Sequence, residues 1–146
     1  MSTILTKTAV PFDGGDAAEL AIETIAPLLH AIDGAVHIVM VLDQHVQDQL
    51  ADFAQVENLT IAQAAESSIA RVVGAAVKLG LPATHEVVSG AEVVAGFTTA
   101  ARKAGCTAIA LPTHGINAVT RWLIGNLRDK IVQAAQLPVL VLPPAS

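Results

Sequence analysis

The run Val36-His-Ile-Val-Met-Val-Leu42 decides the fold class, because every residue in it except His37 is apolar. A nearly continuous apolar run of this length is typical of a strand that is covered on both faces of a parallel sheet. Four other short runs are rich in residues that favour strands, and they span residues 7–12, 84–88, 107–111 and 138–142. We therefore predict five strands.

Longer segments with apolar residues at helical spacing lie between these strands. The four predicted helical stripes are Ala18, Ala21, Ile22, Ile25, Leu29 and Ile32; Ile61, Ala65, Ile69, Val72, Val73 and Ala76; Val93, Val94, Phe97, Ala101 and Ala104; and Leu127, Ile131, Val132 and Ala135. Each stripe gives a helix one apolar face that packs against a sheet. The alternation of strands and helices predicts an α/β fold with a parallel sheet and right-handed crossovers. We expect residues 1–146 to form a single domain.

Local signals mark where the helices begin and end. Asp16, Thr60 and Ser89 each precede a Glu or Gln by three residues, which is the spacing of a capping box. Gly34, Gly80 and Gly105 are predicted to end the first three helices, because glycine adopts a left-handed conformation at low cost. Pro27 removes one backbone donor inside the first helix and is expected to kink it. Residues 43–58 are polar and irregular, so we predict a long surface loop there.

Composition excludes several classes of protein. Of the 146 residues, 53% are hydrophobic, so the chain can bury enough apolar surface to fold. A net charge of -5 repels phosphate backbones and anionic lipid, so we expect neither nucleic acid nor a membrane as partner. Cys106 is the only cysteine, which excludes an intrachain disulfide and a cysteine-based zinc site. No apolar run approaches the roughly 18 residues of a membrane helix and no signal peptide is evident, so a cytoplasmic protein is expected.

Ligands of open parallel sheets bind beyond the carboxyl ends of the strands. The fourth strand is followed by Pro112-Thr-His-Gly115, nine further residues and then Gly125-Asn126 at the start of the last helix. Gly115 and Gly125 allow a phosphate to approach the backbone amides, and the helix N-terminus favours an anion. Arg121 adds a possible charge-assisted contact. The spacing alone fits an ordinary turn and helix cap equally well.

Two stretches identify a family resemblance. The segment 111–126, Leu-Pro-Thr-His-Gly-Ile-Asn-Ala-Val-Thr-Arg-Trp-Leu-Ile-Gly-Asn, followed by the strand at 138–142, resembles the C-terminal signature of the universal stress protein family. That signature is Gly, two residues, Gly, nine residues, Gly and usually Ser or Thr. The opening Val10-Pro-Phe-Asp-Gly-Gly15 is similar to the family's Val-Pro-Val-Asp-Gly-Ser, and the resemblance spans essentially the whole chain.

The resemblance implies a three-layer, Rossmann-like, open five-stranded sheet in the order 3-2-1-4-5, with helices on both faces. It also implies a homodimer formed through the last strand, at Val139, Leu140 and Val141. ATP or another adenine nucleotide is expected to lie across the ends of strands one and four. Asp13 would lie at the adenosine end, and Val41 would offer backbone contacts to adenine. The remaining expected ligand residues are Pro11, Thr113, His114, Gly115, Arg121, Gly125 and Asn126.

Three positions depart from the family pattern. Pro112 replaces the first motif glycine, so a contact that needs an N–H at that position is lost. Ile116 stands where a basic residue is common, which removes a possible phosphate partner. Asn126 replaces the usual hydroxyl residue, and its amide can still donate to an oxyanion.

Several of these residues also have purely structural interpretations. Asp13 suits a turn, and Asn126 followed by Asp129 suits a helix cap. His114 has no neighbouring carboxylate or nucleophile in the sequence, and the other histidines, at 30, 37, 45 and 85, lack metal-ligand spacing. Cys106 is predicted to be a small core residue, whereas Trp122 fits a buried packing role and an exposed interaction role equally well.

Three functional hypotheses follow. The first is a cytoplasmic, ATP-binding, regulatory or protective dimer that is not an enzyme, with slow or absent hydrolysis because no metal-ligand set is evident. The second keeps the fold and the dimer but omits the nucleotide, which leaves a protein–protein interaction module. The third is a small enzyme in which His114 or Asp13 is catalytic.

Overall fold

The computed structural model describes residues 6–90, 92–113, 120–122 and 127–142, and it has the predicted alternation of strands and helices. In chain order the elements are β1 (Lys7–Pro11), α1 (Ala17–Ala31), β2 (Ala35–Leu42), α2 (Gln44–Val56), α3 (Ile61–Lys78), β3 (Ala83–Ser89), α4 (Val93–Lys103), β4 (Ala108–Leu111), α5 (Leu127–Ala135) and β5 (Val139–Val141). Each of the five predicted strands overlaps an observed one.

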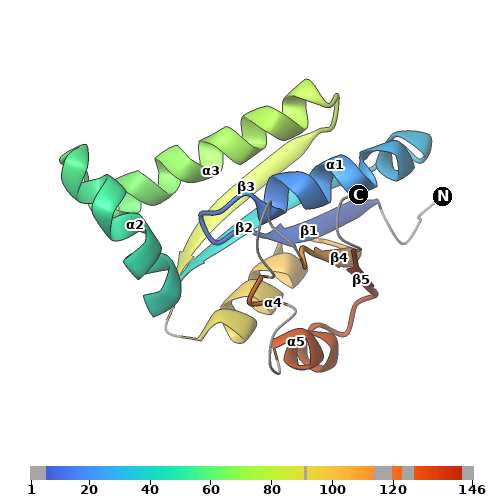
Figure 1. Cartoon of the computed structure of the whole chain (residues 1–146). Helices are drawn as coiled ribbons and strands as arrows, with labels where there is room; N and C mark the ends of the chain where they lie inside the picture. The colour runs from blue at the N-terminus through green and yellow to red at the C-terminus, as the bar shows by residue number, and fades with distance from the viewer. Residues whose placement is uncertain (1–5, 91, 114–119, 123–126, 143–146) are drawn as a thin grey trace.

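The strands form one parallel sheet in the order β3-β2-β1-β4-β5 (Figure 1). The central pairs place Thr8 of β1 beside Val36 of β2 and Ala108 of β4. Strands β3 and β5 are therefore the two edges of the described sheet. This order confirms the expectation drawn from the family resemblance.

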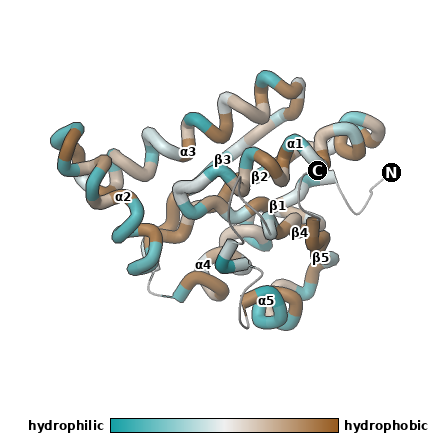
Figure 2. Tube along the Cα trace, viewed as in Figure 1, coloured by the Kyte–Doolittle hydropathy of each residue, from teal (hydrophilic) through white to brown (hydrophobic). Residues whose placement is uncertain are grey.

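Helices cover the two faces of the sheet and bury a separate apolar cluster on each. One cluster contains residues from α1, α2 and α3, including Ile22, Leu50 and Ile69. The other contains residues from α4 and α5, including Phe97 and Ile131. Hydrophobic and hydrophilic residues recur within the turns of the helices, as in amphipathic surface helices (Figure 2). None of the helices within the described ranges is long and apolar enough to span a membrane.

The prediction of a surface loop at residues 43–58 is wrong, because the structure forms α2 there. Val46, Leu50 and Ala54 repeat every four residues and are buried, so this helix has a narrow apolar stripe. The Asp43 side chain accepts a hydrogen bond from the Val46 amide and caps the helix. The many glutamines on the exposed face conceal this stripe in the sequence.

The predicted capping boxes differ in outcome. Thr60 and Gln63 form the reciprocal pair, with the Thr60 amide 2.9 Å from Gln63 Oε1 and the Gln63 amide 3.1 Å from Thr60 Oγ1. Asp16 is the N-cap of α1, but its side chain makes no capping hydrogen bond. The box predicted at Ser89 is wrong, because α4 starts later and Glu92 itself is the N-cap.

Two of the three glycines predicted to end helices have the left-handed conformation expected of them, and the third does not. Gly80 and Gly105 both have a φ of +79°, as expected for residues that end a helix. After α1, however, Asp33 and not Gly34 takes the left-handed conformation, with a φ of +53°. The α5 stripe is also narrower than predicted, because Val132 is 49% exposed.

Candidate functional site

The carboxyl ends of β1, β2 and β4 lie on the same side of the sheet, since the strands are parallel (Figure 1). We call this border of strand ends the sheet edge, as distinct from the edge strands β3 and β5. Five of the predicted ligand residues lie in the described part of this edge: Pro11, Asp13, Val41, Thr113 and Arg121. His114, Gly115, Gly125 and Asn126 lie outside the described residues. The structure therefore describes the site at the ends of β1 and β2 and at residues 112–113 and 120–122.

Asp13 lies in a turn directly after β1. Its Oδ1 accepts a hydrogen bond from the Gly15 amide at 3.2 Å, and Gly14 between them has a φ of +103°. Its other oxygen, Oδ2, lies 3.8 Å from Nε2 of His45 in α2. The turn interpretation of Asp13 therefore holds, and the carboxylate remains only partly buried. The position of His45 depends on α2, so a surface loop at residues 43–58 does not predict it.

Val41 is buried near the end of β2, and Pro11 pairs with Val39 one strand away. The Val41 side chain packs on α4, where a Cβ added to Gly96 would lie 3.1 Å from it. The Val41 carbonyl accepts a hydrogen bond from the Asp43 amide at 2.9 Å. Because a carbonyl has two lone pairs, that oxygen retains one further acceptor position for a ligand.

Arg121 forms an ion pair with Asp43. Its Nη1 lies 2.9 Å from Asp43 Oδ2, and its Nη2 lies 3.4 Å from Asp43 Oδ1. The Arg121 side chain is 17% exposed and that of Asp43 is 10% exposed, so solvent screens the pair only partly. Arg121 Nε is buried and has no hydrogen-bond partner among the described residues. The predicted phosphate ligand is thus held by a carboxylate that lies 78 residues away in the sequence.

Trp122 settles one of the open alternatives. Its side chain is 2% exposed, and its ring lies 6.2 Å from the ring of Phe97 in α4. The guanidinium carbon of Arg121 lies 4.9 Å from the Trp122 ring centroid, within cation–π range. The buried packing role is therefore confirmed, and Trp122 anchors this segment to the α4 side of the sheet.

Two threonines, Thr113 and Thr120, form hydrogen bonds close to the end of β4. The Thr120 amide donates to the Thr113 carbonyl at 3.0 Å, and the Thr120 hydroxyl donates to the Pro112 carbonyl at 2.6 Å. The Thr113 hydroxyl donates to the carbonyl of Leu142, just beyond β5. Pro112 lacks an N–H, so its carbonyl is the backbone polar group it contributes here.

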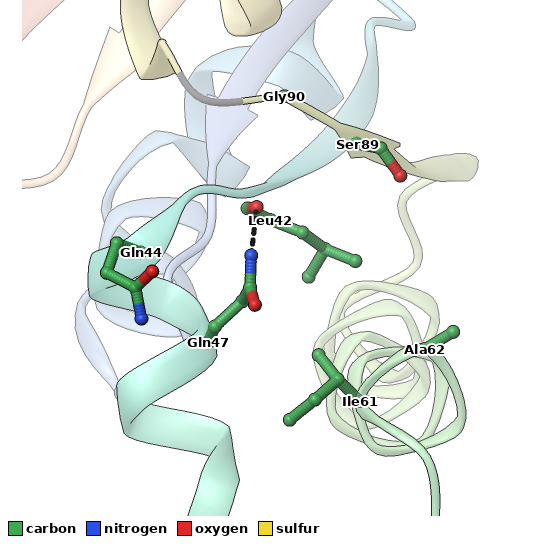
Figure 3. Close-up of a pocket in the computed structure, with 7 residues that line it drawn as sticks. All are labelled: Leu42, Gln44, Gln47, Ile61, Ala62, Ser89 and Gly90. Atoms are coloured by element: carbon green, nitrogen blue, oxygen red, sulfur yellow. Dashed lines mark hydrogen bonds between the residues drawn. The ribbon is translucent and has the colours of Figure 1, made fainter.

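A cavity of about 480 Å³ lies next to this edge, between the first turns of α2 and α3 (Figure 3). Its lining residues carry no formal charge, and they are Leu42, Gln44, Gln47, Ile61, Ala62, Ser89 and Gly90. The side-chain amide of Gln47 donates to the Leu42 carbonyl at 3.0 Å, which fixes that side chain at the cavity wall. None of the predicted ligand residues lines this cavity.

The remaining candidate residues have structural roles. His37 is 5% exposed and bonded through both ring nitrogens, and Cys106 is 6% exposed in the α4 cluster. Burial raises the pKa of the Cys106 thiol to about 11, so it remains protonated at neutral pH. The described residues contain no group of three or more histidine, cysteine or carboxylate side chains that could hold a metal ion.

Comparison with known proteins gives one family match and several similar solved structures. A family model described as the universal stress protein family matches residues 5–143. No curated protein matches the chain. A solved structure of a universal stress protein family member from Burkholderia pseudomallei has a TM-score of 0.64 at 19% identity, over 99% of this chain and 100% of that one.

Two further solved structures contain a ligand. The universal stress protein from Archaeoglobus fulgidus in complex with dAMP has a TM-score of 0.65 at 18% identity, over 94% of this chain and 98% of that one. A universal stress protein in complex with cAMP has a TM-score of 0.65 at 14% identity, over 94% of this chain and 96% of that one. At these identities the likeness shows a shared fold.

Proposed function

This chain belongs to the universal stress protein family, and on that premise we propose that it binds an adenine nucleotide, ATP being the one that the family resemblance implies. The observation that carries the proposal is the convergence of Asp13, Val41 and Arg121 at one sheet edge of a fold that binds dAMP and cAMP in related proteins. The nucleotide would lie across the carboxyl ends of β1 and β4.

In this proposal the adenosine part and the phosphates of the nucleotide contact different residues of the protein. The partly exposed Asp13 carboxylate is an acceptor suited to ribose hydroxyls, and the Val41 backbone is suited to the edge of adenine. The phosphates would meet Thr113, His114, Gly115, Gly125 and Asn126, with the N-terminus of α5 favouring their charge. Arg121 is already paired with Asp43 through one N–H of each terminal nitrogen, so a phosphate would either compete with that carboxylate or use the remaining N–H donors.

We expect the bound nucleotide to regulate and not to be turned over quickly. This proposal rests on the sequence, which shows no carboxylate or histidine spaced as the partner of a nucleophile. Hydrolysis should therefore be slow or absent.

We also propose a homodimer formed through β5. Val141 is 44% exposed on this edge strand, and an exposed apolar strand edge favours pairing with a second copy. The variant Val141→Glu places a charge on that strand at a half-exposed position, so it leaves the buried core unchanged. Light scattering should report a dimer for the natural chain and a monomer for this variant; a natural chain that is monomeric at micromolar concentration contradicts the proposal.

Calorimetric titration with ATP, ADP, AMP and cAMP tests nucleotide binding. We expect saturable heat for at least one of them and a weaker affinity in the variant Asp13→Ala. Absence of heat for all four at near-millimolar concentration, in a protein with a normal unfolding transition, would overturn the proposal. The Val141→Glu variant separates the two claims, because nucleotide binding should survive the loss of the dimer.

Two observations favour a second candidate, a dimeric interaction module that binds no nucleotide. Asp43 already neutralises Arg121, and Pro112 has removed one backbone donor from the motif. In that case Gly115→Ala leaves partner binding intact, and only the charge at Val141 disrupts it. The same titration decides between the candidates, since the module gives no heat with any adenine nucleotide.

A further inference from the structure

A second cavity, of about 500 Å³, lies between the edge strand β3 and the helix α4, and none of the residues predicted to contact the nucleotide lines it. Glu86, Val88, Gly96, Ala100 and Lys103 are among the residues that line it. We propose that this cavity binds a small organic cation, an ammonium or amidinium group attached to an apolar body, with Glu86 as the recognising carboxylate. The proposal is independent of the nucleotide site.

A buried histidine holds Glu86 in place. His37 in β2 is 5% exposed, and its Nε2 lies 3.0 Å from Glu86 Oε1 on the adjacent strand. Its Nδ1 lies 2.7 Å from the hydroxyl oxygen of Thr84, so the imidazole ring is fixed from both sides. With Thr84 donating to Nδ1, Nε2 carries the proton and donates it to the carboxylate. A ligating group that is itself hydrogen-bonded in this way is preorganised for its partner.

The second oxygen of Glu86, Oε2, has no partner among the described residues. The Glu86 side chain is 36% exposed and lines the cavity, and we assign Oε2 as the oxygen that a ligand reaches. A cation with N–H donors gives it a charge-assisted hydrogen bond, which is stronger than one between neutral groups. The geometry thus leaves one anionic acceptor oriented by the protein and open to a ligand.

Part of the cavity wall is formed by small residues without polar side chains. These residues are Val88 of β3 and Ala95, Gly96 and Ala100 of α4. Glycine at position 96 matters, because a Cβ there would lie 3.1 Å from Val41. This wall accommodates a hydrocarbon or aromatic body beside the charged group, the usual combination in small-molecule sites.

The other two charged lining residues fit the same assignment. Both oxygens of Glu92 accept amide hydrogen bonds, from Val94 at 3.1 Å and from Ala95 at 2.6 Å, so this carboxylate caps α4. Lys103 is the one cationic residue that lines the cavity, and the described part of the chain shows no ion pair between it and Glu86. Lys103 therefore opposes the binding of a cation, and its removal should strengthen binding.

The chain contains a matched control for the histidine–carboxylate pair. His85 Nε2 lies 3.4 Å from Glu66 Oε2, and neither residue lines the cavity. Glu66→Gln removes the same charge as Glu86→Gln, from a pair of the same composition. A nonspecific attraction of cations to this acidic protein would respond to both substitutions alike, whereas the proposed site responds to one.

Titration followed by amide NMR tests the proposal, with benzamidine and butylammonium as cations and benzamide as the uncharged match for benzamidine. We expect saturable shifts confined to β3 and α4 for the cations and none for benzamide. Glu86→Gln should weaken binding about tenfold, Lys103→Met should tighten it about two- to fivefold, and Glu66→Gln should leave it unchanged.

Several results would overturn the proposal. These are no saturable shift with either cation at ten-millimolar concentration, equal binding of benzamide and benzamidine, or equal loss in the two glutamine variants. Thr99→Trp, which fills the cavity from an exposed position, must also abolish the shifts. If Glu86→Gln fails to fold, the Lys103→Met and Thr99→Trp variants still decide the outcome, since they predict changes of opposite direction.

Discussion

Arg121 pairs with Asp43 through both terminal nitrogens, at 2.9 and 3.4 Å, and thereby joins the segment after β4 to the end of β2. The same carboxylate caps α2 through the Val46 amide. One side chain therefore fixes the start of a helix and the position of an arginine far along the chain. This carboxylate therefore links three parts of the candidate site, which are the end of β2, the start of α2 and the segment after β4.

Removing the arginine should be costly. Arg121→Met leaves the Asp43 carboxylate, with a side chain only 10% exposed, without its counter-ion. We expect the free energy of unfolding in urea to fall by about 2–4 kcal/mol. Arg128→Met is the control, because Arg128 and Asp129 are both well exposed, and it should cost less than about 1 kcal/mol. Equal losses in the two variants would contradict the assignment.

Asp13 should matter for nucleotide binding more than for folding. Asp13→Ala removes the acceptor proposed for the ribose, and we expect the calorimetric affinity for the nucleotide to fall about tenfold. Asp52→Ala removes the same charge from an exposed position in α2 and should not change that affinity. An Asp13→Ala variant with natural affinity would assign this residue to its turn alone.

Two glycines near the end of α3 should respond oppositely to alanine. Gly74 lies inside the helix with no atom within 4 Å of an added Cβ, so Gly74→Ala should stabilise the protein by about 0.5–1 kcal/mol. Gly80 has a φ of +79°, and its added Cβ would lie 3.0 Å from His30, so Gly80→Ala should destabilise it by about 1–2 kcal/mol. Thermal unfolding of the two variants measures both signs.

The capping box of α3 should contribute measurably to stability. Thr60→Ala removes the hydroxyl that accepts the Gln63 amide, and we expect a loss of about 1 kcal/mol in chemical unfolding. Thr24→Ala is the control, because the Thr24 hydroxyl donates to the Leu20 carbonyl inside α1 and is exposed. That variant should be neutral or slightly more stable, since alanine has the higher helix propensity.

Stability should depend on the ionisation of Cys106 at high pH. Burial raises its pKa from 9.0 to about 11, so the folded state retains a proton that the unfolded state releases. The contribution is complete below pH 9 and is lost as the pH rises towards 11, and it is on the order of 1–2 kcal/mol. The slope of unfolding free energy against pH between these values should be smaller in Cys106→Ala. Equal slopes would show that the thiol does not titrate differently on folding.

Most of the fold is predictable because its signals are local. The apolar run ending at Leu42 and the helical stripe containing Ile22 and Leu29 require only the periodicity of buried positions. Helix α2 is hard to predict from the sequence, since three buried residues on a glutamine-rich helix give a weak apolar signal. The strand order came from the family resemblance, because no local pattern states which strands are neighbours.

The candidate site is less predictable, because its contacts join distant segments. The sequence places Asp13, Val41 and Thr113 after or near strand ends, and the topology brings those ends together. It gives no sign that Asp43 occupies Arg121, because ion pairing between residues so far apart depends on tertiary structure. The His37–Glu86 pair is hidden for the same reason, since only strand register brings the two residues together.

The position of Trp122 gives this protein an internal optical probe. It is the only tryptophan in the chain, and the Arg121 guanidinium lies 4.9 Å from its ring. A ligand that draws Arg121 away from Asp43 must also change the electrostatic field at the indole. The emission wavelength and intensity of a single, unlabelled fluorophore therefore report occupancy at the sheet edge directly.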